Sequence, residues 1–267
     1  MSTTLTKLIF IEGVSGVGKS TMVQTLQKEL TGLGYKVKSY LEGDYTNPID
    51  FYYTAYFTAH EYEKLCYKYS HNREIINMNT IKVDDIRLIR YAHGKEFIFE
   101  EPLLSTLIEN EFCYHPKKII PIDKYISVYT KIWNKYSESL KGKFDFVIFD
   151  GSLLHHPVND IINNYHITGE QAVPFITALL NAIELTEKYI FYLKTDNISI
   201  QLQIAYKDRQ HPKPTGKQIE FWERRFKEDI IVLNSIKENY QTLDISNNCW
   251  DKAKKEILFK IHYIRQT

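Results

Sequence analysis

The sequence has few cysteines, and they are not grouped. Its 267 residues include Cys66, Cys113 and Cys249, which are odd in number, widely spaced and without a CxxC pair. This pattern supports neither a disulfide framework nor a zinc knuckle. We therefore expect a protein of the reducing cytoplasm.

Long hydrophobic runs and an excess of one charge are also missing. No stretch approaches the roughly 20 apolar residues that span a bilayer, and the start, MSTTLTKLIFIEG, lacks the basic region and cleavage site of a signal peptide. Lysine plus arginine number 34 against 33 aspartate plus glutamate, so the net charge attracts neither nucleic acid nor anionic membrane. We expect no nucleic-acid or membrane partner, and any anion site must be local.

The sequence does contain enough apolar residues, 43%, to fill a sizeable core. Apolar runs that read as strands alternate with helical patterns, which predicts a parallel sheet covered on both faces and joined by right-handed crossovers. The predicted strands are 8–12, 36–44, 144–150, 188–196 and, more weakly, 241–246. The predicted helices are 20–30, 169–187, 196–207, 217–238 and 249–264.

Residues 50–140 break this rhythm. They hold Tyr-rich helical patterns, a hairpin signal around 86–101 and a further helix near 123–139. Without an internal repeat or a low-complexity linker, we expect one domain over 1–267. We interpret 50–140 as a mainly helical insertion within it that carries substrate contacts.

A phosphate-binding loop follows the first predicted strand. Residues 13–20, GVSGVGKS, fit GxxxxGK[ST] at every fixed position, between a strand and a helix as the motif requires. Glycines let successive amides turn inward around phosphate, Lys19 reaches the β and γ phosphates, and the Ser20 hydroxyl binds Mg²⁺. The predicted nucleotide contacts of this segment are Gly13, Val14, Ser15, Gly16, Val17, Gly18, Lys19, Ser20 and Thr21.

Such a loop needs a second metal anchor, and an acid at the end of an apolar strand supplies it. FDFVIFD ends in Asp150, which we expect to hold Mg²⁺ beside Ser20. Asp196 ends the next strand in the same way and is the competing candidate, although an Asp there is equally explained as a helix N-cap.

These motifs, with EGVSGVGKST at the start, DGS after the third strand and an arginine near 209, resemble the P-loop nucleotide and small-molecule kinases. Thymidylate kinase, shikimate kinase and the antibiotic phosphotransferases belong to this group. The resemblance covers the core strands and the C-terminal third. It implies a three-layer α/β P-loop fold with a five-stranded parallel sheet of order 2-3-1-4-5, a mobile lid, and ATP and Mg²⁺ as cofactors.

The resemblance also implies an acid facing the phosphate acceptor at the end of the second strand. Asp44 of LEGD stands there, and its carboxylate would orient the acceptor hydroxyl and take its proton. The alternative interpretation is a turn aspartate after Gly43, and Glu42 is the local alternative for the acceptor role.

The lid of such kinases brings arginine to the transferring phosphate. Residues 207–225 hold the richest basic cluster of the chain, and Arg209, at the end of a predicted helix, is the favoured lid residue. The other members are Lys213, Arg224 and Arg225. A solvated loop and helix face, with charge pairs such as Glu220 with Arg224, is the alternative.

At the C-terminal end, LDISNNCWDKAKKEI resembles the kinase segment that lies beside the adenine base. Asn247, Asn248 and Trp250 are the candidate lining residues, with helix capping as the alternative for Asn248.

Other features weigh against some functions. Thymidylate kinases carry Arg-Glu-Pro after the second strand and Arg after the third-strand Asp, where this sequence has 42–44 (EGD) and Gly151. Residues 134–137 (NKYS) lack the Asp of the guanine motif NKxD. The Tyr cluster at 51–69 fits either ring stacking or plain core packing. His155 and His156 read as loop histidines near the site and not as a metal centre.

We therefore predict an ATP-dependent kinase that acts on a small hydroxyl-bearing molecule, since Asp44 would repel an anionic acceptor. A nucleoside or nucleotide kinase is one alternative. An ATP-binding or ATP-hydrolysing regulatory module for a protein partner is the other. A homodimer is a candidate assembly.

Overall fold

The chain is built around a parallel sheet of five strands. The computed structural model describes residues 5–94, 96–184, 186–246 and 249–262. The strand order is β10-β9-β1-β8-β2, and every neighbouring pair is parallel. The strands are β1 (Thr6–Glu12), β2 (Val37–Tyr40), β8 (Phe146–Asp150), β9 (Thr186–Lys194) and β10 (Tyr240–Asp244). Counted in chain order, this is the expected order 2-3-1-4-5, which is confirmed.

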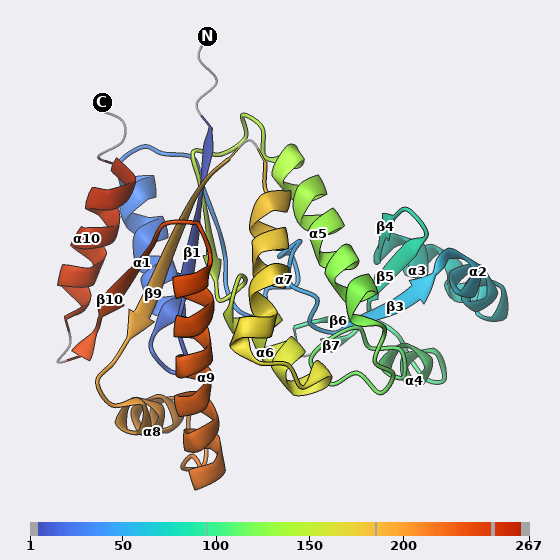
Figure 1. Cartoon of the computed structure of the whole chain (residues 1–267). Coiled ribbons are helices and arrows are strands. Elements are labelled where there is room, and N and C mark those ends of the chain that lie inside the picture. Colours follow the sequence, from blue (N-terminus) through green and yellow to red (C-terminus); the bar gives the residue numbers. More distant parts are fainter. Residues whose placement is uncertain (1–4, 95, 185, 247–248, 263–267) are drawn as a thin grey trace.

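Helices cover both faces of this sheet (Figure 1). Alternate residues of β1 point to opposite sides, as in any strand. Ile9 and Ile11 share a core with α1 (Lys19–Gly32) and α10 (Trp250–His262). Leu8 and Phe10 face a second core. Its helices are α5 (Ile122–Ser139), α6 (His155–Tyr165), α7 (Gly169–Ala182) and α9 (Gly216–Ser235).

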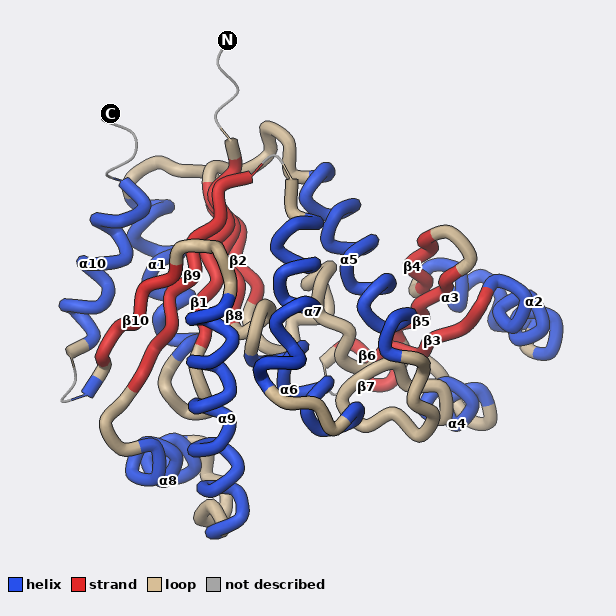
Figure 2. Tube along the Cα trace, viewed as in Figure 1, coloured by secondary structure: helices blue, strands red, loops and turns tan. Residues whose placement is uncertain are grey.

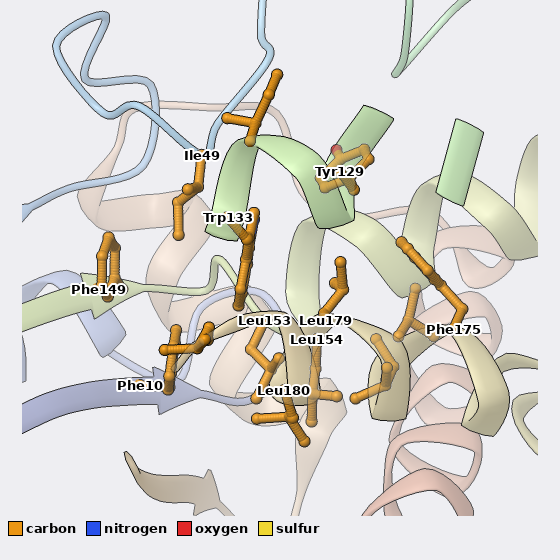
Figure 3. Close-up of a cluster of buried hydrophobic side chains, with 14 of the residues drawn as sticks. Phe10, Ile49, Tyr129, Trp133, Phe149, Leu153, Leu154, Phe175, Leu179 and Leu180 are labelled. Atoms are coloured by element: carbon orange, nitrogen blue, oxygen red, sulfur yellow. The ribbon is translucent and has the colours of Figure 1, made fainter. Parts of the chain in front are cut away.

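Aromatic and aliphatic side chains pack together in the second core (Figure 3). Trp133 of α5 is 1% exposed and stacks on Phe10 at a centroid distance of 5.7 Å, and Phe149 stacks on the same ring at 5.3 Å. Truncation of such a buried aromatic to alanine costs about 3–5 kcal/mol. This contact therefore fixes α5 against the strands that carry the site.

Within the segment 50–140, the elements before α5 form a second, smaller group beside the main sheet (Figure 2), whereas α5 covers the main sheet. A three-stranded antiparallel sheet of order β3-β5-β4 and a short β6-β7 ladder stand among helices. The strands are β3 (Thr54–Thr58), β4 (Thr80–Val83), β5 (Ile86–Arg90), β6 (Ala92–His93) and β7 (Glu96–Phe97). The helices are α2 (Ala59–Lys68), the 3-10 turn η1 (Ser70–Asn72), α3 (Arg73–Met78) and α4 (Leu103–Ile108), followed by α5.

Two details of this segment differ from the sequence expectation. The Tyr-rich stretch expected to be helical begins as strand β3, and its helix starts only after Thr58, whose hydroxyl and the Glu61 carboxylate form a capping box. The stretch 86–101, expected to form one hairpin, instead contributes strands to two separate sheets. Residues 92–93 and 96–97 pair as the β6-β7 ladder, whereas β5 pairs with β3 and β4.

Strand β5 separates two cores. Ile86 and Leu88 belong to the core of α5 and the main sheet, while Ile89 belongs to a small core made with α2, α3 and α4. Helix α8 (Ile198–Asp208), the first helix of the connection from β9 to β10, lies against the phosphate-binding loop. Within the described ranges, no helix is long and apolar enough to cross a membrane.

Candidate functional site

The phosphate-binding loop connects β1 to α1 and is packed by other elements. Gly18 has φ +82°, and a Cβ atom built there would lie 2.2 Å from Cη2 of Trp250. Only glycine accommodates both that backbone conformation and the indole. The side chain of Gln201 on α8 donates a 2.9 Å hydrogen bond to the Gly16 carbonyl. The start of α10 and α8 thus flank the loop on two sides.

Lys19 is the first residue of α1, and its side chain turns back over the loop. The residue is 5% exposed, and its Nζ donates to the Val14 carbonyl at 3.2 Å. The same Nζ lies 3.4 Å from Nδ1 of His155. The Lys19 side chain is therefore held against the backbone of the loop.

Ser20 and Asp150 meet although they are 130 positions apart. The parallel pairing of β1 with β8 places Asp150 opposite Ile11, beside the loop. The Ser20 hydroxyl donates to Oδ2 of Asp150 at 2.6 Å. The other oxygen, Oδ1, is buried and has no hydrogen-bond partner among the described residues. A buried unpartnered carboxylate oxygen next to a hydroxyl fits an oxygen-seeking cation such as Mg²⁺.

Glu12, at the end of β1, was not among the predicted site residues. It is fully buried, and its carboxylate accepts hydrogen bonds from the amides of Leu153 at 2.8 Å and His155 at 2.9 Å. Burial raises its pKa, although these amides and the charge of Lys19 act in the opposite direction. Glu12 therefore fixes the turn between β8 and α6. The sequence signal was an acid directly before the loop glycine, in IEG.

The same turn brings two histidines into the site. Gly151 has φ +65°, and a Cβ atom there would lie 2.9 Å from Cβ of His155 and 3.2 Å from Cε of Lys19. His155 and His156 are the first residues of α6 and are buried, so the expectation of loop histidines is wrong. The turn is tight enough to bury both rings close to the phosphate-binding loop.

His155 has a defined hydrogen bond and a stacked ring. Its Nδ1 lies 3.1 Å from the Gly13 carbonyl, and its ring stacks on Trp222 with centroids 5.2 Å apart. Burial first, and the charge of Lys19 second, hold the pKa of His155 well below its usual value. The imidazole is therefore neutral at physiological pH.

Glu42 and Asp44, the two acids that follow β2, have different surroundings. Glu42 is exposed and lines the main cleft. Asp44 closes a local turn, since its Oδ1 accepts from the amide and the hydroxyl of Thr46 at 2.8 and 2.7 Å. It lines a separate small cavity that also contains Arg90. The structure thus brings the alternative residue, Glu42, to the loop, and Asp44 to the adjoining insertion.

The main cleft has a volume of about 800 Å³ and lies over the loop. Its walls come from the loop, the end of β2, α8 and the β10-α10 connection. The lining residues are Ser15, Gly16, Gly18, Lys19, Ser20, Thr21, Glu42, Thr195, Asp196, Asn197, Ile200, Gln201, Ile204, Ala205, Asp208, Arg209, Ile245, Ser246 and Trp250. Asn247 and Asn248, predicted beside the base, lie outside the described residues.

The basic cluster of 207–225 does not act as one group. Arg209, just after α8, is exposed and lines the cleft. Lys213 lines a different cavity beyond α8, and the guanidinium of Arg224 lies over the Phe221 ring. Arg225 is 1% exposed and pairs with Asp229. The inclusion of Arg225 in a mobile basic cluster is therefore corrected, because it lies on the buried face of α9.

Comparison with known proteins adds only distant likenesses. No protein-family model matches the chain, and no curated protein is significantly similar to it in sequence. Its structure is similar to that of thymidylate kinase from Candida albicans, with 14% identity over 98% of this chain and 93% of that chain and a TM-score of 0.47. It is similar also to a gluconokinase from Sinorhizobium meliloti, with 11% identity over 97% and 94% and a TM-score of 0.43.

Proposed function

We propose that the chain is a phosphotransferase that moves the γ-phosphoryl group of ATP to a small hydroxyl-bearing acceptor. One observation carries the proposal: the hydroxyl of Ser20 and the carboxylate of Asp150 meet at 2.6 Å beside Lys19, and the second carboxylate oxygen is buried without a partner among the described residues. Phosphoryl transfer needs a phosphate cradle, a positioned cation and a positioned nucleophile. The first two requirements fit these residues.

On the donor side, the loop amides and Lys19 would bind the β and γ phosphates. Ser20 and Asp150 would hold Mg²⁺, which when bound neutralises phosphate oxygens and orients them. Arg209 lines the same cleft and is the proposed lid residue, whose guanidinium balances charge on the transferring group. Apolar contacts for the base are available between Trp250 and the exposed Ile200 and Ile204 of α8.

On the acceptor side, we assign the hydroxyl-orienting role to Glu42. This residue lines the cleft, and its backbone amide lies 3.4 Å from Oδ2 of Asp150. The acceptor oxygen forms a bond to the γ-phosphorus and its proton passes to Glu42. The bond from the γ-phosphorus to the bridging oxygen breaks, and ADP leaves.

The surrounding charge favours a neutral or cationic acceptor. Asp44 and the buried Asp50 line the cavity next to Glu42. The Arg90 guanidinium in that cavity donates to the carbonyls of Asn47 and Asp50. Backbone carbonyls thus use part of the hydrogen-bonding capacity of Arg90, and the two carboxylates outnumber its single guanidinium group. An anionic acceptor would meet net repulsion here.

The test is an assay of ADP formation with a panel of neutral and cationic hydroxyl compounds, combined with detection of the phosphorylated product. We expect acceptor-dependent turnover that falls at least about 100-fold in Lys19→Ala. Lys28→Ala, an exposed residue of the same helix, is the matched control and should keep full activity. ADP formation without a phosphorylated product would instead favour a nucleotide-hydrolysing regulatory module. Equal rates for wild type and Lys19→Ala would refute the proposal.

A further inference from the structure

Glu42, which lines the cleft, and the buried His155 and His156 form a group of potential metal ligands. One carboxylate oxygen and one nitrogen of each imidazole all lie within 4.8 Å of one another. The carboxylate follows β2 and the two rings begin α6, so the fold brings together residues that are far apart in the sequence. We propose that these three side chains bind a divalent transition-metal ion of the zinc type, at a site separate from Ser20 and Asp150.

The donor set determines the class of ion. Imidazole nitrogen suits Zn²⁺, Co²⁺ and Ni²⁺, whereas Mg²⁺ prefers oxygen ligands and keeps much of its water. Two histidines and one carboxylate are the ligands of several open zinc sites, in which a fourth position remains for water or substrate. The two histidines and the carboxylate therefore favour a zinc-type ion over the Mg²⁺ that is expected at Ser20 and Asp150.

The two imidazoles are prepared for coordination in different ways. His156 is 8% exposed, and its Nε2 is buried with no hydrogen-bond partner in the part of the chain that the structure describes. For His155, the shorter contact of Nδ1 is 3.1 Å to the Gly13 carbonyl, which can only accept, against 3.4 Å to Nζ of Lys19; the shorter contact favours a proton on Nδ1 and a lone pair on Nε2. A backbone carbonyl on the non-ligating nitrogen is the usual support of a metal-bound histidine.

The ligand atoms must move closer together to hold an ion. In a tetrahedral site with bonds of ~2.1 Å, two ligands of one ion lie roughly 3.4 Å apart. The three ligand atoms lie within 4.8 Å of one another, so the side chains must approach by up to about 1.4 Å. His155 is held by Trp222 and His156 is buried, whereas Glu42 is exposed and is free to move toward the rings.

Lys19 opposes the ion. Its Nζ lies 3.4 Å from Nδ1 of His155, and two positive charges at such short range repel. The carboxylates of Glu42 and Asp150 offset part of this repulsion. Removal of the ammonium group should therefore tighten metal binding while it abolishes phosphate binding. This opposition separates the proposal from the kinase function.

An ion held at this group would lie next to Glu42, on the acceptor side of the cleft. Its open position would then bind the acceptor oxygen and lower the pKa of that hydroxyl. This role rests on the proposed function, whereas binding of the ion does not.

The experiment is a Co²⁺ titration of the full-length protein, without an affinity tag and without nucleotide, followed by visible absorption. We expect one Co²⁺ per chain, retained in excess Mg²⁺ and displaced by Zn²⁺, and no sulfur-to-cobalt charge-transfer band. The affinity should fall at least about tenfold in His156→Ala, His156→Gln and Glu42→Gln. His60→Ala, an exposed histidine of α2, is the matched control and should leave the titration unchanged.

Lys19→Ala gives the distinguishing result. Loss of ATP binding together with equal or tighter Co²⁺ binding supports a separate metal site, whether or not the chain transfers phosphate. Unchanged Co²⁺ binding in both His156 variants, displacement by Mg²⁺, or a thiolate charge-transfer band would overturn the proposal. Circular dichroism of each variant identifies any that fails to fold, and Glu42→Gln, on an exposed position, then decides the outcome.

Discussion

The buried pair of Arg225 and Asp229 allows a sharp test of the architecture under the site. Both residues are 1% exposed, and they sit one helical turn apart on α9. Arg225 also donates to the Leu154 carbonyl at 2.8 Å, and Asp229 accepts from the Tyr192 hydroxyl at 2.8 Å. Burial lowers the pKa of Arg225 to about 10, so the guanidinium remains charged at neutral pH. The pair therefore holds the residue that precedes His155.

Replacement of Arg225 by methionine leaves the Asp229 carboxylate buried, with the Tyr192 hydroxyl as its remaining side-chain partner among the described residues. Loss of one partner from a buried ion pair costs about 3–5 kcal/mol. For a chain of this size, each kcal/mol lowers Tm by roughly 2–4 °C. We therefore expect Arg225→Met to lower Tm by roughly 6–20 °C.

The double variant Arg225→Met/Asp229→Asn removes both charges and keeps an acceptor for Tyr192. It should recover stability to within about 2 kcal/mol of wild type, because a neutral pair replaces an uncompensated charge. Arg224→Met, the exposed neighbour, is the control and should leave Tm unchanged. Differential scanning calorimetry at neutral pH measures all four proteins. If Arg225→Met lowers Tm by less than about 2 °C, or the double variant is no more stable than the single, the reasoning about this pair is wrong.

Three further predictions concern other positions. Burial raises the pKa of Asp160 to about 6 from 3.8. Its ionised form therefore destabilises the fold fully above pH 6, and this penalty disappears as the pH falls from 6 to 4. Asp160→Asn should raise the free energy of unfolding at pH 7 by up to ~3 kcal/mol and flatten the change in Tm between pH 4 and 6. In Gly18→Ala, the added methyl group meets Trp250, and an alanine at a φ of +82° is strained. Nucleotide affinity, measured by tryptophan fluorescence, should therefore fall about tenfold or more. An unchanged affinity would contradict the packing of Trp250 on Gly18. Asp150→Asn should weaken ATP binding in the presence of Mg²⁺ at least about tenfold and leave ATP binding without Mg²⁺ unchanged, as measured by calorimetry. An equal loss of affinity in both conditions would contradict a metal role for Asp150.

Much of the fold and part of the site could be predicted because the signals are local. Apolar runs ending in an acid mark parallel strands, and the carboxyl ends of such strands meet at one edge of the sheet. The shared edge predicts that Asp150 lies beside Ser20, and the 2.6 Å contact between the two side chains agrees with this prediction. The metal role itself stays a prediction until the binding experiment is done.

The less local features could not be predicted in the same way. Glu42 and Asp44 are two residues apart in a turn whose central Gly43 has φ +74°, so the conformation of that glycine decides which carboxylate faces the cleft. In the sequence, Arg225 is part of the basic cluster interpreted as a lid. Its burial could not be predicted there, because it depends on the packing of α9. A signal was present, since Arg225 and Asp229 share a face with the buried Val232 and Leu233 at helical spacing.

The insertion was the hardest part of the chain to interpret. Its aromatic residues fit a helical pattern and a strand pattern over the same short stretch, and tertiary pairing with β5 selected the strand. The boundary was nevertheless encoded, since Thr58 and Glu61 have the spacing of a capping box that starts α2.

The divided packing of β5 has a consequence for how this chain can be modified. Because Ile86 and Leu88 complete the core beneath α5 while Ile89 completes the small core of α2 to α4, the insertion shares apolar surface with the main sheet. Excision of the segment would uncover side chains that also stabilise the sheet carrying the phosphate loop. The insertion and the sheet that carries the loop therefore depend on the same strand, and any exchange of the insertion must keep the alternate side chains of β5.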